Sequence, residues 1–325
     1  MTKKNSLFTT ILATLAFAAA SDAAFAADSD PIRVAHSTWI GYGPLYIAKE
    51  KGFFKDAGVE VDLKIVESSS DSITALAAQR LDAVASTMDS FTLFVGNGAD
   101  LKVVIGMDDS NGGDGIVAKK ELKSPADLKG HTVAVQKGSA SQFLLSQVLA
   151  KDNLTLSDVK VVDMKAGDAG AAFVTGRVDA AVTWQPWLGR AKETDFGHVL
   201  ASTAELPGLI VDAIAFRSAY VKEHPKSVQG FVDGYGKAIE FLHANPAEAK
   251  EIIGRNLSMT PESVEASLGD VQFLGTKENA VFFGGDNSPA HQLAANAGKF
   301  YQTIGILSQA PDPKSFLDAS FVTPR

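Results

Sequence analysis

Short apolar runs alternate with amphipathic helical stretches along most of the chain. In the first third, the pattern predicts strands at residues 32–36, 63–66, 83–87 and 99–105, with helices at 44–51 and 70–79 between them. The second helix-and-strand series predicts strands at 132–135, 159–163 and 180–183 and helices at 141–151 and 170–175. Strands that alternate with helices in this way indicate an α/β fold with mainly parallel sheets.

The two series are copies of each other. Residues 71–83 read DSITALAAQRLDA and residues 168–180 read DAGAAFVTGRVDA, and each segment runs on into a short apolar strand. A β-α-β-α-β unit is therefore present in duplicate, at a spacing far longer than a solenoid repeat. Two α/β lobes of one build place the carboxyl ends of their strands around a cleft, where we expect a ligand site.

The last third of the chain matches neither copy. It predicts a strand at 209–216 and helices at 227–244, 247–256, 261–268 and 288–307. We expect these helices to pack on the first lobe, so that the chain crosses between the lobes twice, near residues 107–116 and 206–214. The prediction is lobe one at 27–113 plus 212–325 and lobe two at 114–211, joined by a double crossing that acts as a hinge.

The composition argues against several classes of function. The 325 residues are 46% hydrophobic, enough for two cores, and the net charge of −8 without a Lys/Arg run argues against binding to nucleic acid. There is no cysteine, and the six histidines never fall at metal-ligand spacing. We therefore expect no metal, no cofactor and no thiol chemistry.

The N-terminus has the features of an export signal. Lys3 and Lys4 precede an apolar run from Leu7 to Ala20, and residues 24–26 (AFA) supply a small-x-small cleavage site. We interpret residues 1–26 as a cleaved secretory signal peptide, which predicts a periplasmic protein.

Several motifs resemble one family. The segment 41–61 (GYGPLYIAKEKGFFKDAGVEV) resembles the opening of periplasmic solute-binding proteins of the nitrate, taurine and aliphatic-sulfonate type, whose superfamily includes thiamine-pyrimidine-binding relatives. Residues 124–130 (SPADLKG), 176–180 (GRVDA) and 184–187 (WQPW) match the same family in order. The resemblance covers the chain from about residue 30 onward. It implies a two-lobe periplasmic binding protein, a "Venus flytrap", that serves the permease and ATPase subunits of an ABC importer.

The loops at the carboxyl ends of the predicted strands supply the candidate site. Tryptophans there offer flat apolar faces that also attract cations, whereas aspartates need a positively charged partner. Few Lys or Arg residues fall in the same loops, which favours a ligand with a positive nitrogen group. The GSAS segment that opens the helix at 141–151 offers free backbone N–H groups to an acid group, or is an ordinary serine N-cap. The predicted ligand-binding residues are Trp39, Tyr42, Asp89, Asp114, Ser139, Ser141, Trp184, Gln185 and Asp212.

This pattern predicts a monomeric binding protein, not an enzyme. The expected cargo is a small amine-bearing or zwitterionic solute, similar to taurine and other sulfonates or to guanidines and amines. The alternatives left open are a nitrate or simple-sulfonate binding protein, and a relative that binds or processes a pyrimidine precursor. Extra carboxylates would repel nitrate, which puts that alternative in doubt.

Overall fold

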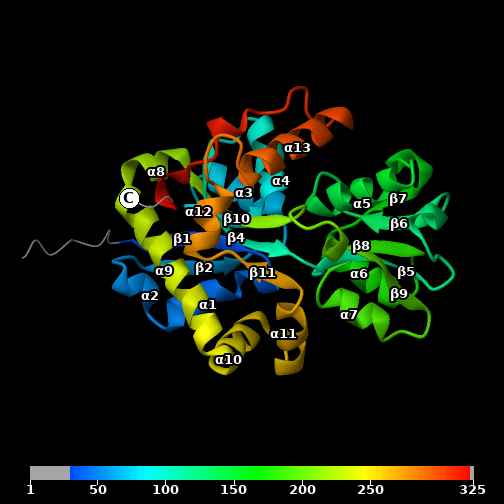
Figure 1. The fold of residues 1–325 in the computed structure, drawn as a ribbon, viewed down its shortest axis with the longest axis horizontal. Coiled ribbons are helices and arrows are strands. Elements are labelled where there is room, and N and C mark those ends of the chain that lie inside the picture. Colours follow the sequence, from blue (N-terminus) through cyan, green and yellow to red (C-terminus); the bar gives the residue numbers. More distant parts are fainter. Residues whose placement is uncertain (1–29, 323–325) are drawn as a thin grey trace, which may run out of the picture.

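The computed structural model describes residues 30–322, which form two α/β lobes side by side (Figure 1). We call the six-stranded sheet with its helices lobe one, and the five-stranded sheet with its helices lobe two. The predicted signal peptide at residues 1–26 lies outside the described residues. Within residues 30–322, no helix is long and apolar enough to cross a membrane.

Lobe one has a mixed sheet with the strand order β11-β4-β10-β3-β1-β2. β1 pairs with β2 and β3 in parallel, whereas β10 runs antiparallel to both β3 and β4, and β11 runs antiparallel to β4. The strands are β1 (Ile32–His36), β2 (Val61–Ile65), β3 (Ala83–Thr87), β4 (Leu101–Ser110), β10 (Val211–Arg217) and β11 (Val271–Phe273).

Lobe two has the order β7-β6-β8-β5-β9. β6 pairs in parallel with β7 and β8, and β5 runs antiparallel to β8 and β9. The arrangement β7-β6-β8 repeats the arrangement β2-β1-β3 of lobe one, as the duplicated sequence predicts. The strands are β5 (Asp114–Lys119), β6 (Thr132–Val135), β7 (Lys160–Asp163), β8 (Ala180–Trp184) and β9 (Gly197–Ser202).

Two segments connect the lobes. The first runs from β4 into β5, and the second runs from β9 through a 3-10 turn, η4 (Thr203–Glu205), into β10. They are hydrogen-bonded to each other, since the Ser110 N–H donates to the Ile210 carbonyl over 2.9 Å and the hydroxyls of Ser110 and Thr203 lie 2.9 Å apart. A paired double crossing of this kind permits bending about one axis.

The helices of the C-terminal third cover lobe one: α9 (Pro225–Ala244) packs on α1 (Gly43–Glu50) and α2 (Phe53–Asp56), and α13 (Pro289–Thr303) packs on α4 (Met88–Gly96). Lobe two carries α5 (Ala140–Lys151), α6 (Ala166–Val174) and α7 (Trp187–Lys192). Lobe one carries α1 (Gly43–Glu50), α2 (Phe53–Asp56), α3 (Ser69–Ala77), α4 (Met88–Gly96), α8 (Ser218–Glu223), α9 (Pro225–Ala244), α10 (Pro246–Leu257), α11 (Pro261–Leu268), α12 (Thr276–Phe282) and α13 (Pro289–Thr303).

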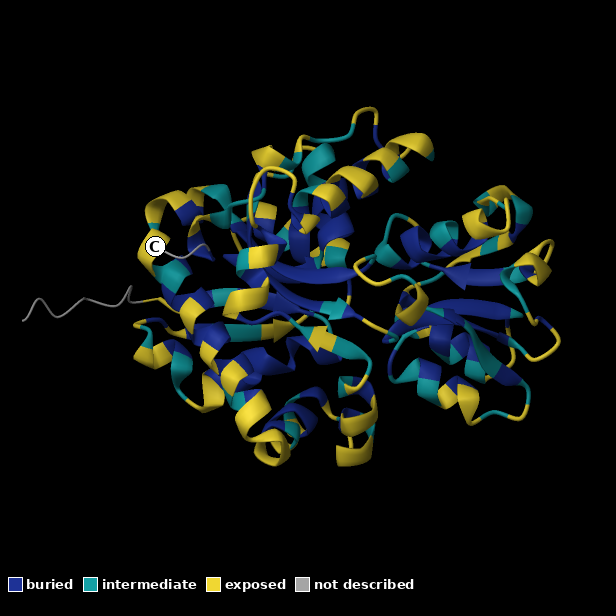
Figure 2. Cartoon of the chain, in the orientation of Figure 1, coloured by how far each residue is buried: buried dark blue, intermediate teal, exposed yellow. Residues whose placement is uncertain are grey.

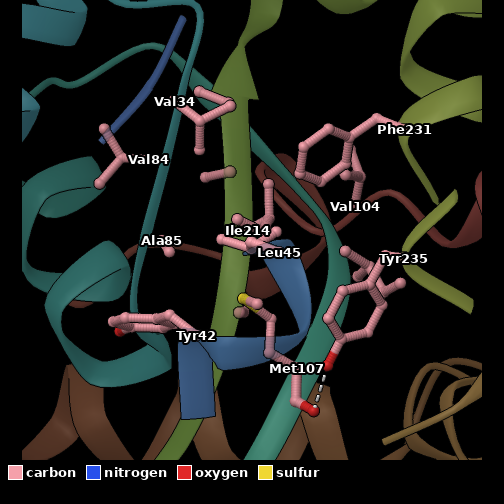
Figure 3. Close-up of a cluster of buried hydrophobic side chains, with 14 of the residues drawn as sticks. Val34, Tyr42, Leu45, Val84, Ala85, Val104, Met107, Ile214, Phe231 and Tyr235 are labelled. Atoms are coloured by element: carbon pink, nitrogen blue, oxygen red, sulfur yellow. Dashed lines mark hydrogen bonds between the residues drawn. The ribbon is translucent and has the colours of Figure 1, made fainter. Parts of the chain in front are cut away.

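Both sheets lie in buried layers between helices (Figure 2). In lobe one, side chains from β1, β3, β4, β10, α1 and α9 form one apolar cluster (Figure 3). Tyr235 crosses this cluster, and its hydroxyl donates to the Met107 carbonyl over 2.7 Å. Tyr42 also belongs to this cluster.

The structure contains elements that the sequence pattern does not predict. Residues 87–90 read as a loop after the third strand, yet α4 begins at Met88. Its sequence, MDSFTLFVG, is apolar on most positions, and such a run does not reveal a helical period. Strands β5, β9 and β11 and helices α7 and α12 are short and were likewise not predicted. Ser124 and Asp127 form a capping box at the start of a 3-10 turn, η2 (Pro125–Leu128).

Candidate functional site

A small cavity of about 70 Å³ lies between the lobes, next to the two crossing segments. Seven of the nine predicted residues line it, and they come from both lobes. The seven are Trp39, Tyr42 and Asp212 from lobe one, and Asp114, Ser139, Ser141 and Trp184 from lobe two. Their role in ligand binding remains a prediction. Five of them lie at or after the carboxyl ends of the parallel strands β1, β6 and β8, whereas Asp114 and Asp212 lie at the beginnings of β5 and β10, which run antiparallel to β8 and β3.

The lining also contains polar residues that were not predicted, namely Glu67, Ser69, Ser86 and Gln136. Three of them follow the end of a parallel strand: Glu67 and Ser69 follow β2, and Gln136 follows β6. Residues that follow the carboxyl ends of parallel strands face the crevice, so the same argument applied to every parallel strand would have predicted these three.

A wider groove of about 680 Å³ opens between α5, α13 and residues 206–209. It has no buried charged side chain in its lining, and Lys299 is exposed. The smaller cavity has buried acids, aromatic side chains from both lobes and contributions from both crossing segments, so we place the site there.

The cavity is strongly acidic. Asp114 and Asp212 are 8% and 3% exposed, Glu67 lies at an exposed position, and among the described lining residues none is Lys, Arg or His. Two further acids, Asp89 and Asp108, are buried next to the lining. A buried carboxylate is costly unless it meets a positive charge or strong hydrogen-bond donors.

Aromatic side chains donate hydrogen bonds to three of these acids. The Tyr42 hydroxyl donates a short hydrogen bond to Oδ1 of Asp212. The indole Nε1 of Trp39 donates to Oδ1 of Asp108 over 3.1 Å. The third pair is Tyr301 of α13, whose hydroxyl donates to Oδ2 of Asp89 over 2.7 Å.

These donors do not offset the loss of water around the acids. Burial raises the pKa of Asp114 to about 7 and that of Asp108 to about 8. Burial also raises the pKa of Asp212 well above its ordinary value, and the negative charge of Asp108 raises it further. The pKa of Asp89 is raised by burial too. The cluster therefore holds protons at neutral pH, which a cation entering the cavity would displace.

Two predicted residues do not line the cavity. Asp89 is 1% exposed in the first turn of α4, where it accepts the Tyr301 hydrogen bond and adds negative charge behind the wall. Gln185 instead connects the lobes: its Nε2 donates to Oδ2 of Asp270, between α11 and β11, over 2.8 Å. Side chains alternate direction at the end of a strand, so Gln185 points away from the cavity that Trp184 faces.

The N-terminus of α5 faces the cavity through Ser139, Ala140 and Ser141. Ser139 is the N-cap residue, but its hydroxyl makes no capping bond and donates to the Gln136 carbonyl over 2.7 Å. The ordinary serine cap is therefore not what the structure shows. The helix end keeps a partial positive charge that would favour an acid group on a ligand.

The lobes contact each other at several points around the cavity. Besides the Gln185–Asp270 bond, the rings of Phe143 in α5 and Phe300 in α13 lie 4.9 Å apart. At the α3 side, Nζ of Lys165 lies 4.0 Å from Oδ2 of Asp71.

Within residues 30–322, no group of His, Cys, Asp and Glu is suited to a metal ion.

The comparisons with known proteins agree with this architecture. The model of the family described as NMT1/THI5 like matches residues 39–249. A protein of Brucella abortus strain 2308, named only as a binding protein, is 29% identical over 301 residues, covering 91% of this chain and 93% of its own. The taurine-binding periplasmic protein of Escherichia coli K12 is 27% identical, covering 96% and 98%.

Among solved structures, the alkanesulfonate-binding protein of Xanthomonas axonopodis pv. citri bound to MOPS superposes with a TM-score of 0.74. It is 20% identical, and the match covers 89% of this chain and 98% of that one. This likeness confirms the two-lobe periplasmic-binding-protein fold.

Proposed function

Because the chain belongs to the NMT1/THI5-like family, we propose that it is the periplasmic solute-binding component of an ABC importer. Its cargo is a small organic solute that carries a positively charged nitrogen group, either a simple cation such as an amine or guanidine, or a zwitterion of the taurine type. The protein captures this solute in the cavity between the lobes and leaves it chemically unchanged. It acts as a monomer that docks on permease and ATPase subunits.

One observation carries the choice of ligand: buried acids converge on the cavity, with no Lys, Arg or His among its described lining residues. A cation satisfies Asp114 from lobe two and Asp212 from lobe one at once, so that binding stabilises the closed form. Trp184 adds a flat face suited to stacking on a cation. A zwitterion would place its acid group against the N-terminus of α5.

Matched ligands test the proposal. Purified mature protein is screened by thermal shift and calorimetry against taurine, ethanesulfonate, ethylamine, guanidinium and nitrate. Ethanesulfonate is taurine without its amine, and ethylamine is taurine without its sulfonate. Binding of taurine with no binding of ethanesulfonate or nitrate is the expected result for a zwitterion site, and binding of ethylamine or guanidinium is expected for a cation site.

The opposite result is also informative. If nitrate or ethanesulfonate binds while the amine-bearing compounds do not, the alternative of a nitrate or simple-sulfonate binding protein replaces this proposal. Mass spectrometry after prolonged incubation with each bound compound checks for chemistry. A new product would contradict the proposal that the protein only binds.

A further inference from the structure

Asp108 is a buried acid that does not line the cavity and is not among the residues predicted from the sequence to bind a ligand. It lies in β4 with 0% exposure, one layer behind the cavity wall. Its Oδ1 accepts the hydrogen bond from Trp39, whereas its Oδ2 has no hydrogen-bond partner. A buried carboxylate oxygen without a donor is costly, so this atom needs a proton of its own or a function.

The strand register places a second acid next to Asp108. Asp108 of β4 and Asp212 of β10 are directly opposite each other in the antiparallel ladder. Opposed residues of such a ladder share one face of the sheet, with their Cβ atoms about 5 Å apart. Two like charges at that spacing are destabilising, and in a buried site one of them stays protonated.

Trp39 and Tyr42 donate hydrogen bonds to the pair, but no positively charged group is among the described residues that act on it. The titratable groups that act on it are Asp114 from β5, Asp89 from α4, Asp109 from the same strand, Tyr42 from η1 (Ile40–Tyr42) and Tyr235 from α9. All of them are acids or phenols, and none brings positive charge. Only Asp212 of the pair lines the cavity, so a ligand meets Asp212 and not Asp108.

We propose that Asp108 is a positioning residue for the cation site: with a cation against Asp212, Asp108 keeps one proton and donates it in a hydrogen bond to Asp212. The pair then presents a single negative charge to the ligand, and the proton that Asp212 gives up passes to solvent. Asp108 also holds the Trp39 indole against the cavity through the same carboxyl group. This inference rests on the proposed function, since it assumes a ligand with a positive nitrogen.

The proposal assigns Asp108 the role of a neutral donor, which an amide can imitate. In Asp108→Asn, the side-chain oxygen accepts from Trp39 and the side-chain nitrogen donates to Asp212. Asp108→Leu keeps a similar volume but can do neither. Asp109→Asn is the matched control, because Asp109 is the next residue of β4 and its side chain points to the other face of the sheet.

Affinities for guanidinium (as its chloride, at millimolar concentration or below) and for taurine are measured by calorimetry from pH 5.5 to 9. Asp108→Asn and Asp109→Asn should bind within about threefold of wild type at pH 7. Asp108→Leu should bind about tenfold or more weakly, as expected for the loss of a hydrogen bond to a charged group. The pH midpoint of its affinity should rise, because Asp212 without a donor ionises less readily.

Three results would contradict the role of Asp108 or the function on which it rests. If Asp108→Asn loses as much affinity as Asp108→Leu, Asp108 acts as a charge, and the proposal is wrong. If Asp108→Leu binds like wild type with the same pH midpoint, Asp108 has no positioning role. If wild type binds neither probe, the proposed function fails, and the pair is then judged by a measurement without ligand.

That measurement is infrared spectroscopy of the ligand-free protein at neutral pH. Wild type should show the carbonyl band of a protonated carboxylic acid, with a loss of intensity in Asp108→Asn and no change in Asp109→Asn. The infrared measurement does not use Asp108→Leu, so it tests the proposal even if that variant does not fold. Absence of the band from the wild-type protein would overturn the shared proton independently of any ligand.

Discussion

Gln185 of lobe two donates a hydrogen bond from Nε2 to Oδ2 of Asp270 in lobe one, over 2.8 Å. Gln185 is 8% exposed, and its Oε1 accepts from the Gly189 N–H over 3.1 Å, so the amide is held at both ends. The bond joins the lobes next to Trp184, which lines the cavity. We expect it to stabilise the arrangement of the lobes that binds the ligand.

Gln185→Ala should therefore weaken ligand binding without touching the ligand. The expected loss is about fivefold, in line with a net value of about 1 kcal/mol for one hydrogen bond. Calorimetry measures the affinity, and small-angle scattering measures the radius of gyration of the ligand-free protein, which should increase. Gln147→Ala in α5 is the control, since that side chain lies in the wide groove and should leave both quantities unchanged. Equal affinities of Gln185→Ala and wild type would contradict this stabilising role.

Removing either cavity acid should abolish most of the binding. Asp114→Asn and Asp212→Asn are each expected to weaken the affinity about a hundredfold, as for the loss of one partner of a buried charge pair. Glu67→Gln should cost only a few-fold, because Glu67 is exposed and water screens its charge. Titration of all three variants against one ligand gives the ranking. A larger loss for Glu67→Gln than for Asp212→Asn would place the ligand outside the cavity.

The buried acids also predict how stability depends on pH. The pKa values of about 7 for Asp114 and about 8 for Asp108 lie above the value of about 3.9 in unfolded chains. Between pH 4 and pH 8, the folded state thus binds more protons than the unfolded state, and the free energy of unfolding falls as the pH rises. Above about pH 8 this contribution levels off.

Urea unfolding of the ligand-free protein at pH 5.5, 7 and 8.5 measures this trend. The slope should be smaller in Asp114→Asn, which has one buried acid fewer. Ligand affinity should change in the opposite direction and strengthen as the pH rises, since the cation favours the ionised acids. A ligand-free protein that grows more stable from pH 5.5 to 8.5 would exclude the raised pKa values.

Trp184 provides a test of stacking. Trp184→Ala should weaken binding about tenfold and Trp184→Phe only about threefold, because a smaller ring keeps part of the attraction for a cation. Trp187→Phe is the control: that ring packs under Arg190, whose guanidinium carbon lies 4.5 Å from its centroid, and it does not line the cavity. Identical affinities for Trp184→Ala and wild type would remove Trp184 from the site.

Much of the candidate site follows from the sequence because strand ends are local features. β1, β3 and β6 begin and end at the predicted residues, and residues placed after such strands must face the crevice of an α/β lobe. Trp39, Tyr42, Ser139 and Trp184, which this argument selects, line the cavity, and their role in binding stays a prediction. The argument does not tell which way a side chain points, and Gln185 contacts Asp270 of lobe one instead of lining the cavity.

The buried strand position of Asp108 could not be predicted from the sequence. The apolar pattern predicts a strand that ends at Ile105, but β4 continues to Ser110 because β10 and β11 pair with it. A polar residue near the end of an apolar run looks like part of a loop. Pairing partners a hundred residues away turn it into a buried strand position.

The sequence by itself determined the α/β class, the duplicated unit and the family, because apolar periodicity, turn residues and motifs are properties of neighbouring positions. The tertiary structure decided which acids meet. Asp108 and Asp212 are opposite each other only in the register of β4 and β10, and Asp114 reaches them through the first crossing segment, which pairs with the second. Ladder register and the pairing of the crossing segments depend on contacts between distant segments, and a local pattern does not record them.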